Sequence, residues 1–164
     1  MQGEGKEAED FSEKGSSGVA GDGKGNLSNG RIIESENSNG KQLDGIRVLL
    51  AEDYLINQRL LTMMLETHGA MVSVANDGKE AFQKAKLELY DIILMDLNMP
   101  NINGIQSSKM IKMFAIETPI VCLTADVNDE ILQNILASGM EEIVTKPCQI
   151  DELVEVILKY TTIK

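Results

Sequence analysis

Cysteines and long apolar runs are scarce in this sequence, and each shortage excludes a class of protein. The 164 residues include two cysteines and no tryptophan. Cys122 and Cys148 are too few for a disulfide framework or a zinc set, so we expect reduced thiols. No run approaches the roughly 20 apolar residues of a membrane-spanning helix, and the first residues lack the apolar core of a secretion signal. We therefore expect a soluble, cytoplasmic protein.

Positive charge is scarce too. The 15 lysines and arginines stand against 26 aspartates and glutamates, which gives a net charge of −11. The negative electrostatic potential of such a charge opposes binding to a phosphate backbone, so we expect no nucleic-acid partner. The chain also lacks the Gly-x-x-x-x-Gly-Lys loop that cradles nucleotide phosphates, and its length leaves room for one ordinary domain and a tail. These features argue against ATP binding and exclude a large multidomain enzyme.

Glycine is distributed unevenly and marks the start of the folded part. Nine of the 14 glycines fall in the first 44 residues, among Ser, Asn, Glu and Lys and without a hydrophobic period. A segment of this composition cannot offset the entropy of ordering by burial. We expect residues 1–44 to form a flexible, disordered tail or linker and residues 45–164 to form one folded domain.

From Gly45 onward, short apolar runs rich in Val and Ile alternate with longer amphipathic stretches. The runs predict buried strands and the stretches predict helices, and Gly69 and Gly139 are placed to end two of these helices. The expected strands are Ile46–Ala51, Met71–Ala75, Asp91–Met95, Ile120–Thr124 and Glu142–Thr145, and the expected helices are Leu55–His68, Gly78–Leu89, Ile105–Phe114, Asn128–Ser138 and Ile150–Tyr160. This alternation predicts an α/β fold, a doubly wound parallel sheet with helices on both faces.

Polar residues lie at the ends of four of the predicted strands. Glu52 and Asp53 follow the first strand, Asp96 the third and Lys146 the fifth, while Thr124 ends the fourth. The carboxyl ends of parallel strands share one edge of a sheet, so we expect these side chains to lie together. Two carboxylates about 4 Å apart repel each other by about 4 kcal/mol at an effective dielectric near 20. Lys146 or Mg²⁺, which prefers oxygen ligands, could supply the compensating charge.

The alternative is that these residues are unrelated loop residues and helix caps. A single acid at a strand end is more often a cap or a solvated loop residue than a metal ligand. Five polar positions that converge from separate elements are harder to explain in this way. We therefore interpret the set as a functional site.

The motifs around these residues resemble the receiver domain of two-component response regulators. The resemblance runs from about Ile46 to Tyr160, with every motif in order. It rests on Leu49–Asp53, on Asp91–Pro100 with Gly104, on Leu123–Ala125 and on Thr145–Pro147. The segments Ala51–Gln58 and Gly139–Glu142 are most similar to receivers attached to hybrid histidine kinases. The resemblance implies a flavodoxin-like (βα)5 sheet in the order 2-1-3-4-5.

The resemblance also assigns a role to each residue of the set. Asp96 is the implied phosphoacceptor, and Lys146 and Thr124 are implied to contact phosphoryl oxygens. Mg²⁺ is the implied cofactor. Its implied ligands are Asp53 and Asp96 directly, Glu52 through a water molecule, and the main-chain carbonyl of Asn98. Pro147 matches the family's proline after a cis peptide bond, although by itself it could simply end a strand.

Two positions depart from the common family pattern, and two others are expected to influence the lifetime of the phosphoryl group. Ile143 occupies a place where many receivers carry Tyr or Phe, so an aromatic readout of activation is in doubt. Glu52 replaces the commoner Asp, and its extra methylene still allows a water-bridged contact with the metal. Asn98 and Asp126 occupy the positions that influence how water reaches the phosphorus. Both are small and polar, so we expect self-dephosphorylation within seconds to minutes.

The first predicted helix is apolar on more than one side. On a helical wheel, Leu61 and Leu65 lie outside the arc that we expect to face the core. They are candidates for contact with a histidine-bearing helical bundle, unless the last helix covers them. The expected core arc is formed by Ile56, Leu60, Met63 and Met64. His68, the only histidine, is expected to cap the end of this helix rather than to carry phosphate.

The function that follows is a phosphorelay receiver and not an enzyme in its own right. We expect phosphoryl transfer from a histidine phosphotransfer protein or a histidine kinase to Asp96, and a monomer without direct membrane insertion. The chain could form the cytosolic end of a membrane-anchored kinase. Two alternatives remain: a degenerate receiver that only binds partners, and an aspartyl phosphohydrolase. Asn98 argues against the phosphohydrolase, because it cannot protonate a leaving group.

Overall fold

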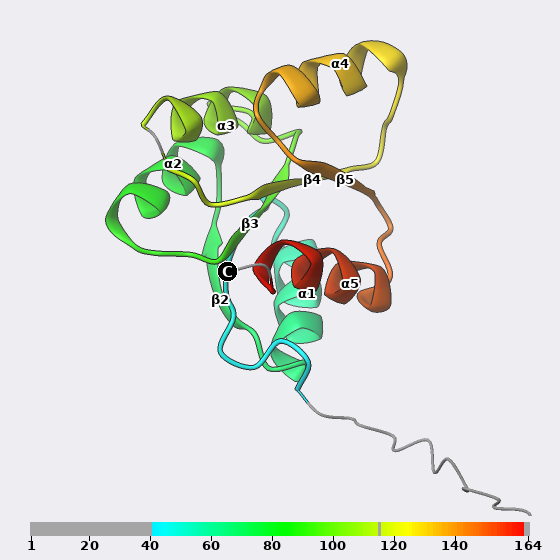
Figure 1. The fold of residues 1–164 in the computed structure, drawn as a ribbon. Helices are drawn as coiled ribbons and strands as arrows, with labels where there is room; N and C mark the ends of the chain where they lie inside the picture. Colours follow the sequence, from blue (N-terminus) through cyan, green and yellow to red (C-terminus); the bar gives the residue numbers. More distant parts are fainter. Residues whose placement is uncertain (1–40, 115, 163–164) are drawn as a thin grey trace, which may run out of the picture. The chain divides into compact units, whose positions relative to one another are not determined.

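A five-stranded parallel sheet organises the chain (Figure 1). The computed structural model describes residues 41–114 and 116–162. The strand order is β2-β1-β3-β4-β5, which confirms the flavodoxin-like topology. The strands are β1 (Arg47–Ala51), β2 (Met71–Ala75), β3 (Ile92–Asp96), β4 (Ile120–Thr124) and β5 (Glu142–Thr145), and the helices are α1 (Leu55–Thr67), α2 (Gly78–Leu87), α3 (Gly104–Met113), α4 (Asp129–Ala137) and α5 (Ile150–Thr161).

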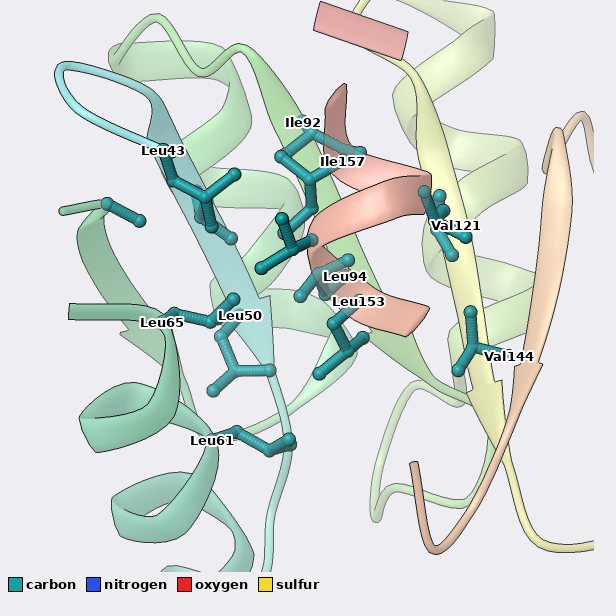
Figure 2. Packing of buried hydrophobic residues seen from close by; sticks show 14 of the residues in the cluster. Leu43, Leu50, Leu61, Leu65, Ile92, Leu94, Val121, Val144, Leu153 and Ile157 are labelled. Atoms are coloured by element: carbon teal, nitrogen blue, oxygen red, sulfur yellow. The ribbon is translucent and has the colours of Figure 1, made fainter. Parts of the chain in front are cut away.

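Alternate residues of each central strand contribute to two hydrophobic clusters on opposite faces of the sheet. In β1, Leu50 packs with Leu65 of α1 and Leu153 of α5, as Figure 2 shows. Its neighbour Leu49 belongs to the other cluster, with Ala81 of α2 and with residues of α3 and α4. Because the central strands are covered on both faces, their side chains alternate between two cores, which explains their unbroken apolar sequences.

The predicted elements agree with the observed ones to within two residues at each end. α1 ends at Thr67, and His68 is its C-cap, with Nδ1 2.9 Å from the carbonyl oxygen of Met64. Gly69 then adopts φ 97° and Gly139, after α4, adopts φ 85°. Both glycines take the left-handed conformation that other residues rarely adopt, so the predicted helix stops are confirmed.

The packed part of the chain begins before the boundary expected at Gly45. Residues 1–40 of the predicted tail lie outside the described residues. Leu43, which the sequence placed in that tail, is fully buried among residues of α1 and β1. Its backbone N–H donates to the carbonyl of His68 at 2.9 Å. A single apolar residue in a turn has no period, so the pattern that located the first strand could not detect it.

The orientation predicted for α1 is wrong for three of the four residues of the expected core arc, and the fourth, Met64, is half-buried and packs against the core. Leu61 and Leu65 are 5% and 0% exposed and face the core, whereas Ile56 is 62% and Met63 60% exposed. The buried stripe includes the polar Gln58. The helical wheel failed because α1 carries apolar residues on both sides, and because a polar residue that finds hydrogen-bond partners can occupy the buried side.

The helices are short. α1, the longest of those described, has 13 residues. Among residues 41–114 and 116–162, none has the length and apolar character needed to cross a membrane.

Candidate functional site

The carboxyl ends of β1, β3, β4 and β5 bring the predicted residues together. We call Glu52, Asp53 and Asp96 the acidic rim: each places one carboxylate oxygen within 4.8 Å of the others. Glu52 and Asp96 are buried at 1% and 6% exposure, while Asp53 is exposed. β1 and β3 are adjacent parallel strands, so residues far apart in sequence meet at their common end. The prediction from strand ends is thus confirmed in its geometry.

Lys146 reaches this rim from the end of β5. Its Nζ lies 2.6 Å from Oε2 of Glu52 and 3.0 Å from Oδ2 of Asp96. Burial alone would lower the pKa of Lys146, but the hydrogen bonds to these two carboxylates outweigh burial and raise it. The Lys146–Pro147 peptide bond is cis, as the resemblance implied. Lys146 therefore stands as a cation between two buried acids.

Asp96 carries a partly destabilised negative charge. Burial raises its pKa above the ordinary value, the bond to Lys146 opposes this, and the charge of Glu52 adds to it. The backbone N–H of Asn98 donates to Oδ1 of Asp96 at 3.2 Å. Desolvation makes a carboxylate more basic, and an N–H donor and an ammonium group keep it oriented.

Thr124 ends β4 beside the rim and is 1% exposed. Its hydroxyl donates to the carbonyl of Asp126 at 3.1 Å and accepts from the N–H of the same residue at 3.2 Å. Thr124 also lines a groove of about 530 Å³ together with Asn98 and Asp126. The groove is thus lined by residues that follow β3 and by residues at and after the end of β4.

Two features of the site had no role assigned from the sequence. Asn57 donates from Nδ2 to Oε1 of Glu52 at 3.2 Å. Gln58 donates from Nε2 to the backbone oxygen of Glu52 at 2.5 Å and to Oδ1 of Asn76 at 2.9 Å. Both residues lie in the motif that supported the resemblance, but their contacts depend on the entry angle of α1, which no local pattern encodes.

Gly104 permits the close approach of α3 to the end of β3 at Asp96. A Cβ atom at Gly104 would lie 2.1 Å from the backbone oxygen of Asp96. The N–H of Gly104 donates to the carbonyl of Leu97 at 3.0 Å. Only glycine fits at this contact.

In β5, one of the two edge strands, Ile143 is half-buried and packs against the cluster that contains Leu49.

Sequence comparison gives the same assignment as this geometry. The model of the response regulator receiver domain matches residues 48–158. The chain belongs to the response regulator receiver family. Its members serve in two-component phosphorelay systems. The receiver is 34% identical over 116 residues to the transcription factor SKN7 of Saccharomyces cerevisiae, a match that covers 71% of this chain and 19% of that protein.

Solved structures support the fold of the receiver and its family. The receiver domain of the sensor histidine kinase PA1611 from Pseudomonas aeruginosa is 32% identical, with a TM-score of 0.67, and the match covers 72% of this chain and 98% of that one. That structure has a magnesium ion in its active-site cleft.

A second structure is that of the Ssk1 receiver domain of S. cerevisiae with the phosphotransfer protein Ypd1. The match has 30% identity and a TM-score of 0.69, and covers 73% of this chain and 91% of that one. The receiver spans about a fifth or less of the length of curated relatives such as the SKN7 transcription factors and the sensor histidine kinase RcsC.

Proposed function

We propose that the chain accepts a phosphoryl group from a phosphohistidine donor onto Asp96 in a Mg²⁺-dependent reaction. The observation that carries this proposal is the meeting of three carboxylates with Lys146 at one end of the sheet. A structural ion pair would need one acid for one base. Here two buried acids share one lysine and a third acid is exposed beside them, which leaves the rim with an excess of negative charge.

The residues fit Mg²⁺ by their chemistry. The ion takes oxygen ligands, typically one or two carboxylates with several waters, and the acidic rim offers oxygens within 4.8 Å of one another. Asp53 and Asp96 would hold the ion directly, Glu52 would act through water, and the carbonyl of Asn98 would complete the set. When bound, Mg²⁺ neutralises charge on the phosphoryl oxygens during transfer.

The chain's own side chains carry the remaining chemistry. An oxygen of Asp96 attacks phosphorus while the bond from phosphorus to the donor's imidazole nitrogen breaks, and that nitrogen keeps the electron pair. Lys146, held 3.0 Å from Asp96, is placed to pair with a phosphoryl oxygen. The Thr124 hydroxyl would break its hydrogen bond to Asp126 and donate to another phosphoryl oxygen. Because the hydrogen bonds between Thr124 and Asp126 would change only after phosphorylation, this change would couple the modification to the β4–α4 loop.

The exposed face of α1 is the surface we propose for the phosphodonor. Ile56, Leu60 and Met63 are 62%, 49% and 60% exposed, although all are apolar. Leu60 also lines a pocket with Lys146 and Cys148, so this face adjoins the site. A histidine-bearing helical bundle would cover such a patch, as receivers in phosphorelays meet helical donors. These residues take the place of Leu61 and Leu65, which are buried in the core.

The wider organisation of the chain follows from the same assignment. We propose a receiver domain that covers residues 45–164 and includes the buried Leu43, that is preceded by a linker, and that acts as a monomeric signalling module rather than as a free-standing enzyme. It would work in the cytoplasm, alone or as part of a histidine kinase. The phosphohydrolase alternative is disfavoured because Asn98 lines the groove beside Asp96 where an acid would be needed.

Acetyl phosphate provides the direct test of this chemistry. The unaltered chain with Mg²⁺ should gain one phosphoryl group, detected by intact mass, and should lose it within seconds to minutes. Asp96→Asn should gain none, whereas Asp151→Asn, an exposed acid of α5, should behave like the unaltered chain. An adduct that persists in Asp96→Asn, or that forms equally after chelation of Mg²⁺, would contradict the proposal. Steady release of phosphate from unrelated esters would favour the phosphohydrolase.

A further inference from the structure

We infer that Asn57 is a positioning residue that fixes Glu52 for metal binding, an inference that rests on the proposed function of the rim. The Glu52 carboxylate has both oxygens engaged by the chain. Oε1 accepts from Nδ2 of Asn57 at 3.2 Å and from the N–H of Tyr54 at 3.3 Å. Oε2 lies 2.6 Å from Nζ of Lys146. Asn57 thus holds one oxygen on the α1 side, while the other meets Lys146.

The length of the glutamate explains why such a restraint matters. Glu52 has one more rotatable bond than an aspartate at the same place, and holding it in one rotamer costs conformational entropy. The side chain is 1% exposed, so water cannot easily replace a lost donor. The amide of Asn57 supplies a directional bond that selects one orientation of the carboxylate. An aspartate would be one methylene shorter and would not reach this amide.

The backbone around Asn57 is held independently of its side chain. Gln58 bonds both the carbonyl of Glu52 and the side chain of Asn76, which anchors the first turn of α1. The N-cap residue, Tyr54, makes no side-chain cap bond, and the Asn57 amide donates to a carboxylate rather than accepting from the helix N-terminus. Removal of the Asn57 amide should therefore act on Glu52 and leave the helix in place.

A double-mutant cycle on Mg²⁺ affinity tests this inference. Mg²⁺ is titrated without any phosphodonor into the unaltered chain, Asn57→Ala, Glu52→Asp and the double variant, by calorimetry or by amide shifts in NMR. Loss of a partner of a direct metal ligand typically weakens metal binding by about tenfold to a hundredfold, and because Glu52 would reach the ion through water we expect the low end of that range. We expect about tenfold weaker binding for Asn57→Ala, but less than a twofold change when the same substitution is made on Glu52→Asp. Asn134→Ala, an exposed asparagine of α4, serves as the matched control.

The possible outcomes distinguish failure of the inference about Asn57 from failure of the proposed function. Thermal unfolding midpoints of the four proteins report whether α1 stays folded. Equal weakening by Asn57→Ala in the unaltered chain and in the Glu52→Asp variant would show that Asn57 acts through the helix, and unchanged affinity in Asn57→Ala would show that it does not act at all. Either result overturns the inference while the proposed function stands. Absence of Mg²⁺ binding by the unaltered chain would overturn both.

Discussion

Replacement of Lys146 by methionine should destabilise the fold by leaving two buried acids without their cation. At an effective dielectric near 20, charges at 2.6 Å and 3.0 Å attract by about 6 and about 5.5 kcal/mol before desolvation is counted. Most of this gross attraction offsets the cost of burying the charges. Removal of one partner from a buried pair typically costs about 3 to 5 kcal/mol. Since Lys146 retains 18% exposure, we expect about 3 kcal/mol at neutral pH.

The assay is urea unfolding of Lys146→Met, with and without saturating Mg²⁺. A cation that binds the rim should restore more stability to the variant than to the unaltered chain, because the variant's carboxylates have no other counter-charge. The deficit should also shrink at acid pH: burial raises the pKa of Asp96, so protonation removes its charge earlier than for an ordinary aspartate.

Lys159→Met removes an exposed ion pair to Glu142 and should change stability little. A loss below about 1 kcal/mol for Lys146→Met, or equal stabilisation of the variant and the unaltered chain by Mg²⁺, would show that Lys146 does not compensate the charge of the buried acids.

Further predictions concern the backbone contact at Gly104 and the exposed face of α1 that we propose for the phosphodonor. Gly104→Ala should lower the free energy of unfolding by about 2 kcal/mol, measured by chemical denaturation, and should slow phosphorylation by acetyl phosphate, because the added Cβ meets the backbone of Asp96. An unchanged unfolding free energy and an unchanged rate would show that the close approach at Gly104 does not require glycine. Leu60→Glu with Met63→Glu should slow transfer from a histidine phosphotransfer protein by about tenfold or more, since a charge would be buried in the interface, while leaving acetyl phosphate labelling intact. Leu136→Glu, on the exposed side of α4, is the control, and equal effects of both changes would exclude α1 as the docking face.

The sheet and the gathering of the site could be predicted from the sequence because both follow from one rule. Strands buried on two faces are apolar up to their last residue, as in β3 and β4, and parallel strands end at a common edge. Once the strand ends were located, it could be inferred that Asp53, Asp96 and Lys146 lie close together. These inferences needed no knowledge of how the helices pack.

Features that depend on helix packing were not accessible in the same way. The face of α1 that meets the sheet includes Gln58, because its amide bonds the Glu52 backbone and Asn76, and hydropathy cannot anticipate such a bond. Leu43 joins the core from a turn outside any periodic pattern. The contact from Asn57 to Glu52 depends on where α1 begins relative to β1. In each case a tertiary contact decided the environment of a residue whose local signal was neutral or misleading.

Transfer of a phosphoryl group from a histidine to Asp96 is the step on which the proposed function depends. It can be followed with a histidine phosphotransfer protein that carries a radiolabelled phosphoryl group, mixed with the chain and Mg²⁺ and sampled over time. We predict that the label moves to the unaltered chain, that peptide mapping places it on Asp96, and that Asp96→Asn receives none. Label on another residue, or equal labelling of Asp96→Asn, would contradict this assignment.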